Sequence, residues 1–249
     1  MNEVKINGKL PPHIKNVIEK NNFSLVEVDS LGDQYLFDDH GILSLITQPM
    51  IERKERPLLI DLTKLLNYHQ RKRYSIHKEL FAKALGRGEL RKSSVCDLTC
   101  GMGNDFALML SFGVKEINAF ERNPYVFLLL YDAWKRAGLE ERENVKLYFG
   151  DYLEPGNSWQ ISGDIMYFDP MFEHLEKRKS LQKKEMRIFQ EVLPKYLFET
   201  TLFSKFNQSN FSKLIIKRPL RNPFYLEQEP HCSFSGKSIR YDVYLKLHQ

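Results

Sequence analysis

The sequence is poor in the features that would place a protein outside the ordinary globular class. Three cysteines in 249 residues cannot all pair, which argues against a disulfide framework. The first residues lack the basic-then-apolar layout of a signal peptide. The longest purely apolar run, near 126–130, is far shorter than the roughly 18 residues of a membrane span. We therefore expect a reduced, cytoplasmic protein with no membrane partner.

The sequence does contain enough hydrophobic residues to form one core of ordinary size. Hydrophobic residues make up 42% of the chain and charged residues 28%, with no internal repeat. Short apolar runs separated by Gly, Pro and Asp predict small strands and turns near the start. We divide the chain into a small N-terminal α+β segment, 1–74, and a main domain, 75–249, which begins with a helix predicted over 75–85.

The main domain alternates strands with helices, which predicts an α/β fold with a mostly parallel sheet. The last two strands flank a short Gly-Lys-Ser turn and predict an antiparallel C-terminal hairpin. This layout resembles the Rossmann-like, class I methyltransferase fold. Strands are predicted over 95–99, 116–121, 145–149, 164–168, 213–217, 232–235 and 240–245, and helices over 105–112, 124–137 and 181–193.

A glycine turn follows the first of these strands. Gly101 and Gly103 let the backbone approach a ligand closely, and Asn104 and Asp105 open the next helix. A dinucleotide fingerprint would place a third glycine at Phe106, which disfavours a pyrophosphate ligand. Asp97, at the end of the strand, favours a cationic ligand such as S-adenosyl-L-methionine. The alternative is an ordinary glycine turn with a capping aspartate.

Two more acids end the second and third strands. A carboxylate at Glu121 can accept both hydroxyls of a ribose. Asp151 can accept the amino group of an adenine, with apolar neighbours holding the ring. Each acid alone could be a turn or helix-cap residue, but three in register on successive strands indicate a nucleoside-bearing cofactor.

The fourth strand ends in Asp169-Pro170-Met171-Phe172, and a doubly wound sheet would place this strand beside the first. A carboxylate and a backbone carbonyl can accept the two hydrogens of an exocyclic amine, which favours the geometry needed to attack a methyl group. Phe172 would stack on the flipped base. We therefore predict that Asp169, Pro170 and Phe172 are catalytic, although Asp-Pro also forms common turns.

Longer stretches around these residues resemble the bacterial small-subunit ribosomal RNA methyltransferases that modify the exocyclic N2 of a guanine. The stretches are Tyr167 to His174, Lys183 to Gln190, Glu121 to Pro124, Ile216 to Pro219 and Arg240 to Tyr244. The resemblance implies that S-adenosylmethionine is bound through Asn104-Asp105, Glu121-Arg122, Asp151-Tyr152 and Asp169. Family members commonly have Arg-Asp at the first of these pairs and two serines at the third, so this chain departs from the pattern there.

Basic residues cluster in two stretches of the sequence, and such clusters favour binding of a polyanionic ligand. Residues 53–92 contain twelve Lys or Arg against four Asp or Glu. We predict contacts to small-subunit ribosomal RNA, free or in the small ribosomal subunit; the alternative is a solvated basic face. No metal site is indicated, because the histidines lack metal-ligand spacing. The predicted RNA contacts are Arg71, Lys72, Arg73, Lys183, Lys184, Arg187, Lys217 and Arg218.

Three other functions fit parts of this pattern. Methylation of a DNA adenine or a protein glutamine uses similar motifs of an acid or amide followed by proline. A non-catalytic RNA-binding protein could retain the cofactor pocket. A nicotinamide-dependent dehydrogenase is disfavoured by Phe106.

Overall fold

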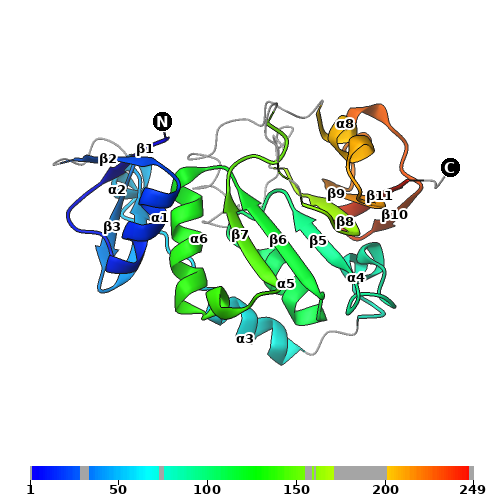
Figure 1. Ribbon diagram of the computed structural model, residues 1–249, viewed down its shortest axis with the longest axis horizontal. Helices are drawn as coiled ribbons and strands as arrows, with labels where there is room; N and C mark the ends of the chain where they lie inside the picture. Colours follow the sequence, from blue (N-terminus) through cyan, green and yellow to red (C-terminus); the bar gives the residue numbers. More distant parts are fainter. Residues whose placement is uncertain are drawn as a thin grey trace.

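The computed structural model describes residues 2–28, 34–72, 76–154, 159, 161–170 and 201–246, which fold around two β-sheets (Figure 1). The larger sheet has seven strands in the order β10-β11-β9-β8-β5-β6-β7. The strands from β9 to β7 are parallel neighbours, and β11 runs antiparallel to both β9 and β10. The strands are β5 (Ser94–Asp97), β6 (Glu116–Glu121), β7 (Val145–Phe149), β8 (Ile165–Phe168), β9 (Lys213–Pro219), β10 (Cys232–Ser235) and β11 (Ile239–Leu245).

Helices cover both faces of this sheet. Along β8, Ile165 and Tyr167 belong to one hydrophobic cluster, and Met166 and Phe168 belong to a second cluster on the opposite face. Such burial on both faces explains why the strands appear in the sequence as short continuous apolar runs. The first cluster includes side chains of α4 (Leu80–Leu85), α5 (Asn104–Phe112) and α6 (Pro124–Arg136), and the second includes side chains of α8 (Thr201–Gln208). None of the described helices is long and apolar enough to cross a membrane.

The N-terminal residues form the second sheet, which packs against α6, and Figure 1 shows α6 between the two sheets. The buried carboxylate of Asp132 on α6 contacts His13 Nε2 at 2.7 Å and Arg136 Nε at 2.8 Å. Apolar residues of the small sheet belong to the same core cluster as α6. The sheet has the order β2-β1-β3-β4, formed by β1 (Asn2–Ile6), β2 (Phe23–Glu27), β3 (Tyr35–Asp39) and β4 (Ile42–Ile46), with α1 (Lys15–Lys20) and α2 (Gln48–Glu52) beside it.

Helix α3 (Leu62–Lys72) lies before the predicted boundary at residue 74 but packs against α5 and α6. The boundary remains a prediction, and the structure shows one hydrophobic core shared by the two parts. The helix predicted over 75–85 begins only at Leu80, because Glu79 has an extended backbone with φ −70° and ψ 126°. The helix predicted over 181–193 lies outside the described residues.

Gly103 and Gly138 provide a matched test of how α3 packs on the glycine turn. Both have a left-handed backbone, with φ of +78° and +65°. A Cβ atom at Gly103 would lie 2.8 Å from Leu62 Cδ2 and 3.2 Å from Leu130 Cδ1, whereas at Gly138 it would meet nothing within 4 Å.

We expect Gly138→Ala to lower the free energy of unfolding by about 1 kcal/mol, the cost of left-handed backbone for alanine. Gly103→Ala should lower it by about 3 kcal/mol, because steric overlap adds to that cost. Denaturant titration of both variants measures the difference. Equal losses would contradict the close packing of α3 on the turn.

Candidate active site

The candidate active site lies where β5, β6 and β8 end side by side. Their carboxyl ends meet at one edge because the three strands are parallel neighbours. After β5 the chain turns through residues 98–103 before α5 begins. The Leu98 N–H donates to the Tyr167 carbonyl on β8, and the Cys100 N–H donates to the Phe120 carbonyl on β6, each at 2.9 Å. The glycine turn is therefore held by both neighbouring strands.

Glu121 ties the end of β6 to this turn. Its Oε2 accepts from the Gly101 N–H at 2.9 Å, and its Oε1 accepts from the Asn123 N–H at 2.7 Å. Burial raises the pKa of Glu121 to about 7, although these hydrogen bonds oppose the rise. Each carboxylate oxygen has a further lone pair, so the group can still accept hydrogen bonds from a ligand.

Asp97 and Asp169 are linked through Thr99. Asp97 Oδ1 accepts from the Thr99 N–H at 3.1 Å, and Thr99 Oγ1 accepts from the Asp169 N–H at 2.7 Å. This chain of bonds brings the end of β8 to the turn after β5. Burial raises the pKa of Asp97 well above its usual value, and the carboxylates of Asp105, Asp169 and Glu121 raise it further.

Lys217 on β9 lies between two of these carboxylates. Its Nζ is 2.7 Å from Asp105 Oδ2 and 2.8 Å from Asp169 Oδ2. The Tyr167 hydroxyl also donates to Asp105 Oδ2, at 2.5 Å. Burial disfavours charge on Asp105, but the Lys217 ammonium outweighs it and lowers the pKa of Asp105. Burial raises the pKa of Asp169 to about 6, with Lys217 opposing the rise.

Asp151 follows β7 and lies at the same edge of the sheet. Its Oδ1 accepts from the Leu153 N–H at 2.8 Å, and its Oδ2 is 3.6 Å from Arg122 Nη1. Tyr152 is buried as deeply as Asp151, but its ring packs in the core, with its centroid 5.4 Å from that of Phe120. The acid is therefore positioned at the edge, whereas the ring of Tyr152 packs beneath the sheet.

The electrostatics of this edge suit a cation. Among the described residues, five carboxyl groups gather here, and Lys217 and Arg122 pair with three of them. A bound sulfonium or ammonium would relieve the mutual repulsion, whereas a pyrophosphate would increase it. The carboxyl groups are those of Asp97, Asp105, Glu121, Asp151 and Asp169.

Within the described ranges, no three His, Cys, Asp or Glu side chains are grouped as metal ligands, and the absence of a metal site remains a prediction.

The other predicted site residues fall into four groups. Asn104 is exposed in the first turn of α5, and Pro170 is buried directly after Asp169. Arg71 and Lys72 are exposed on α3. Arg218 is buried and donates to the Pro223 carbonyl at 3.0 Å. Five predicted residues lie outside the described part of the chain: Arg73, Phe172, Lys183, Lys184 and Arg187.

The sequence predicts that Lys217 contacts RNA and does not predict that it pairs with two carboxylates. The alternation of side chains along the strand could have indicated that pairing. Lys217 lies two residues after Ile215, so both side chains face the side of the sheet that α5 covers. Asp105 is in the first turn of α5, where a buried strand cation can reach it.

Comparisons with known proteins agree with this fold. A family model described as "Putative SAM-dependent methyltransferase" matches residues 20–246. Ribosomal RNA small subunit methyltransferase J from Histophilus somni is 32% identical over 83% of this chain and 83% of its own. The protein of that name from Pseudoalteromonas translucida is 32% identical over 87% of this chain and 86% of its own. A crystal structure of a SAM-dependent methyltransferase from Neisseria gonorrhoeae has a TM-score of 0.71 and 26% identity, covering 98% of this chain and 96% of the other.

The sheet topology, the family model and the solved structure together define a Rossmann-like, S-adenosylmethionine-dependent methyltransferase. The chain belongs to the family of ribosomal RNA small subunit methyltransferase J. The fold class, cofactor and family resemblance predicted from the sequence are thus confirmed. The nicotinamide-dependent dehydrogenase is not favoured.

The Lys217→Met variant tests the shared ion pair. Without the ammonium, Asp105 and Asp169 would repel each other inside the fold, so we expect a loss of about 2 kcal/mol in the free energy of unfolding near pH 8. The loss should shrink toward about pH 5, because one carboxyl can then take up a proton.

Lys213→Met is the matched control on the same strand. Lys213 Nζ donates to the Leu85 carbonyl at 3.1 Å, and burial lowers the pKa of this lysine. This variant should show no comparable dependence on pH. A Lys217→Met deficit that stays constant with pH would contradict the proposed repulsion between the two carboxylates.

Proposed function

We propose that this protein transfers the methyl group of S-adenosylmethionine to the exocyclic N2 of a guanine in small-subunit ribosomal RNA. The names of the relatives support the substrate. The observation that carries the proposal is the position of Asp169 and Pro170 at the end of β8, where Thr99 Oγ1 bonds to the Asp169 N–H beside the glycine turn. An RNA substrate of this kind implies a cytoplasmic location.

Asp169 and the Pro170 carbonyl are the proposed acceptors for the amine of the base. A guanine amine is a poor nucleophile because its lone pair is delocalised, and two acceptors favour the pyramidal geometry needed for attack. Lys217 engages Asp169 Oδ2 at 2.8 Å, and the second oxygen of the carboxylate is the proposed acceptor for the amine. Phe172, outside the described residues, is proposed to stack on the base.

The cofactor is proposed to bind at the carboxylate-rich edge. S-adenosylmethionine supplies an electrophilic methyl group when bound. Glu121 is assigned the ribose hydroxyls, and Asp151 is assigned the adenine amino group. Asp97 and Asp105 are proposed to face the cationic end of the cofactor, whose charge would favour the ionised form of Asp97. The backbone at Gly101, Gly103 and Asn104 and the side chain of Arg122 complete the proposed contacts, whereas Tyr152 supports the edge from the core.

RNA contact is proposed for two groups of basic residues. Arg71, Lys72 and Arg73 form one group, and Lys183, Lys184 and Arg187 form the other. We leave Lys217 and Arg218 out of this interface, because their side chains bond to carboxylates and to a backbone carbonyl of the protein. The substrate is ribosomal RNA, free or in the small subunit.

The Asp169→Ala variant tests the proposed reaction. Loss of an acceptor that stabilises developing charge should lower turnover by about a hundredfold or more. Asp169→Asn should retain intermediate activity, because an amide oxygen still accepts a hydrogen bond but cannot pair with the Lys217 ammonium. Radiolabelled S-adenosylmethionine and small subunits lacking the modification provide the assay, and mass spectrometry identifies the methylated nucleoside.

Two results would contradict the assignment. Full activity of Asp169→Ala would remove Asp169 from the reaction, and label on an adenine or on protein glutamine would replace the proposed substrate. Glu143→Ala, which removes an exposed carboxyl, controls for a general loss of charge.

Cofactor affinity should depend on pH through Glu121. With a pKa of about 7, this carboxyl is mostly protonated near pH 6 and mostly ionised near pH 7.5. Because the ionised form accepts the ribose hydroxyls, the affinity for S-adenosylmethionine should rise by about eightfold over that interval, the ratio of the ionised fractions. Calorimetry at several pH values measures the rise. Glu121→Gln should abolish it, and an unchanged profile in that variant would exclude Glu121 as its source.

A further inference from the structure

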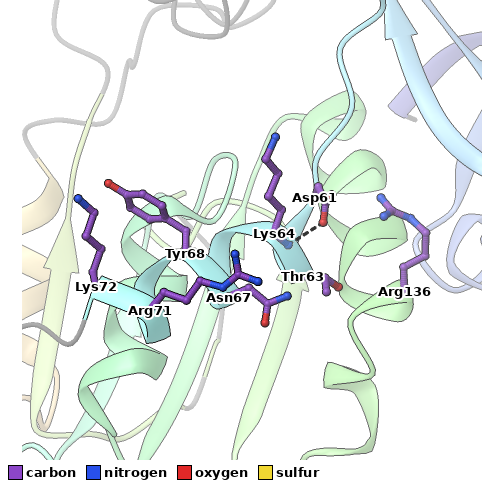
Figure 2. Close-up of a pocket in the computed structure, with 8 residues that line it drawn as sticks. All are labelled: Asp61, Thr63, Lys64, Asn67, Tyr68, Arg71, Lys72 and Arg136. Carbon is purple, nitrogen blue, oxygen red and sulfur yellow. Dashed lines mark hydrogen bonds between the residues drawn. The ribbon is translucent and has the colours of Figure 1, made fainter.

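An open groove with a volume of about 790 Å³ lies along α3 (Figure 2). Figure 2 shows Lys64, Tyr68 and Lys72 projecting from the same side of the helix, as their spacing of four residues requires. Asn67 and Arg71 form a second row beside them. The full lining consists of Asp61, Thr63, Lys64, Asn67, Tyr68, Arg71, Lys72 and Arg136.

The groove is cationic. Four of its side chains are basic and one is acidic, which gives a formal charge of 4 − 1 = +3. Asp61 Oδ1 accepts from the Lys64 N–H at 2.8 Å, and Arg136 is held by Asp132 and by the Ile60 carbonyl. Lys64, Arg71 and Lys72 are exposed to solvent, so their charges are available to an anionic ligand.

An exposed aromatic ring lies among these cations. Tyr68 is 51% exposed, and Lys72 Nζ is 5.3 Å from the centroid of its ring. The neighbouring His69 ring lies edge-on to Tyr68, with centroids 5.3 Å apart. Cations that line a groove beside an exposed aromatic ring suit single-stranded nucleic acid, with phosphates on the charges and a base on the ring. An acidic peptide would use the charges but would gain little from the ring.

The opposite side of α3 covers the glycine turn. Leu62 Cδ2 lies 2.8 Å from where a Cβ atom of Gly103 would be. At the other end of the helix, His69 is close enough to Asp105 for that carboxylate to raise the pKa of His69, although burial is the larger effect and lowers it. Helix α3 therefore packs against α5 at the glycine turn, and His69, which follows the groove residue Tyr68, approaches Asp105 of the candidate active site.

We propose that the groove along α3 binds a single-stranded segment of the RNA substrate close to the target nucleotide. Lys64, Arg71 and Lys72 neutralise phosphates, and one base stacks on Tyr68. The inference rests on the proposed function, because it takes RNA as the substrate.

Binding of a short fluorescein-labelled oligouridylate, followed by anisotropy at several salt concentrations, tests the groove. Tyr68→Ala should weaken binding by about tenfold, whereas Tyr68→Phe should stay within about twofold of the wild type because the ring is kept. Arg71→Ala with Lys72→Ala should reduce the slope of log affinity against log salt by about 1.4, since each phosphate contact on a single strand contributes about 0.7.

Lys92→Ala with Lys115→Ala is the matched control. It removes two exposed positive charges that precede β5 and β6, at the sheet edge opposite the glycine turn. This control should leave the salt slope and the affinity unchanged. Calorimetry with S-adenosylmethionine should show that the groove variants retain their cofactor affinity, which excludes a loss of fold.

The outcomes separate the groove from the proposed function. If the groove variants and the control bind the oligouridylate alike while the wild type methylates guanine N2, the groove proposal is wrong and the function stands. If the wild type neither binds RNA nor methylates small subunits, both proposals fail. If Arg71→Ala with Lys72→Ala reduces the salt slope but Tyr68→Ala has no effect, the groove contacts phosphates only, and the proposed stacking of a base on Tyr68 is wrong.

Discussion

The ammonium of Lys217 lies between the carboxylates of Asp105 and Asp169, and the candidate active site depends on this shared cation. Without it, the first turn of α5 and the end of β8 would bring two partly buried negative charges together. With it, Asp169 can remain ionised beside the glycine turn while Asp97 and Glu121 stay close by. The same cation therefore stabilises the packing of a helix on the sheet and prepares the group that is proposed to hold the substrate.

Backbone hydrogen bonds and a carboxylate together hold the glycine turn in place. Its amides bond to Tyr167 on one side and to Phe120 on the other, and the Glu121 carboxylate closes the arrangement at Gly101. Rigid parallel strands thus fix the acids, whereas α3 lies over the turn and presents its cationic side to solvent. The proposed cofactor site therefore lies on the inner side of α3, at the glycine turn, and the proposed RNA groove lies on its outer side.

Much of the main domain could be predicted from the sequence, because strands buried on both faces leave short apolar runs between turn residues. Strands β6, β7 and β10 have the predicted bounds, and Asp97, Glu121 and Asp169 meet where strand ends were expected to meet. Helix α3 could not be predicted in the same way, since Leu62 is its one fully buried residue and its packing partner is a distant glycine turn. The role of Lys217 also depends on tertiary packing, which local patterns do not report.

The position of α6 between the two sheets has a consequence for how the chain can be divided. Asp132 takes one partner from the N-terminal segment, His13, and one from its own helix, Arg136. A fragment that started at α3 would lack His13 and would leave the apolar surface of α6 facing water. The N-terminal sheet is therefore not a detachable module: proteolytic trimming there would produce an aggregation-prone remnant rather than a minimal catalytic unit.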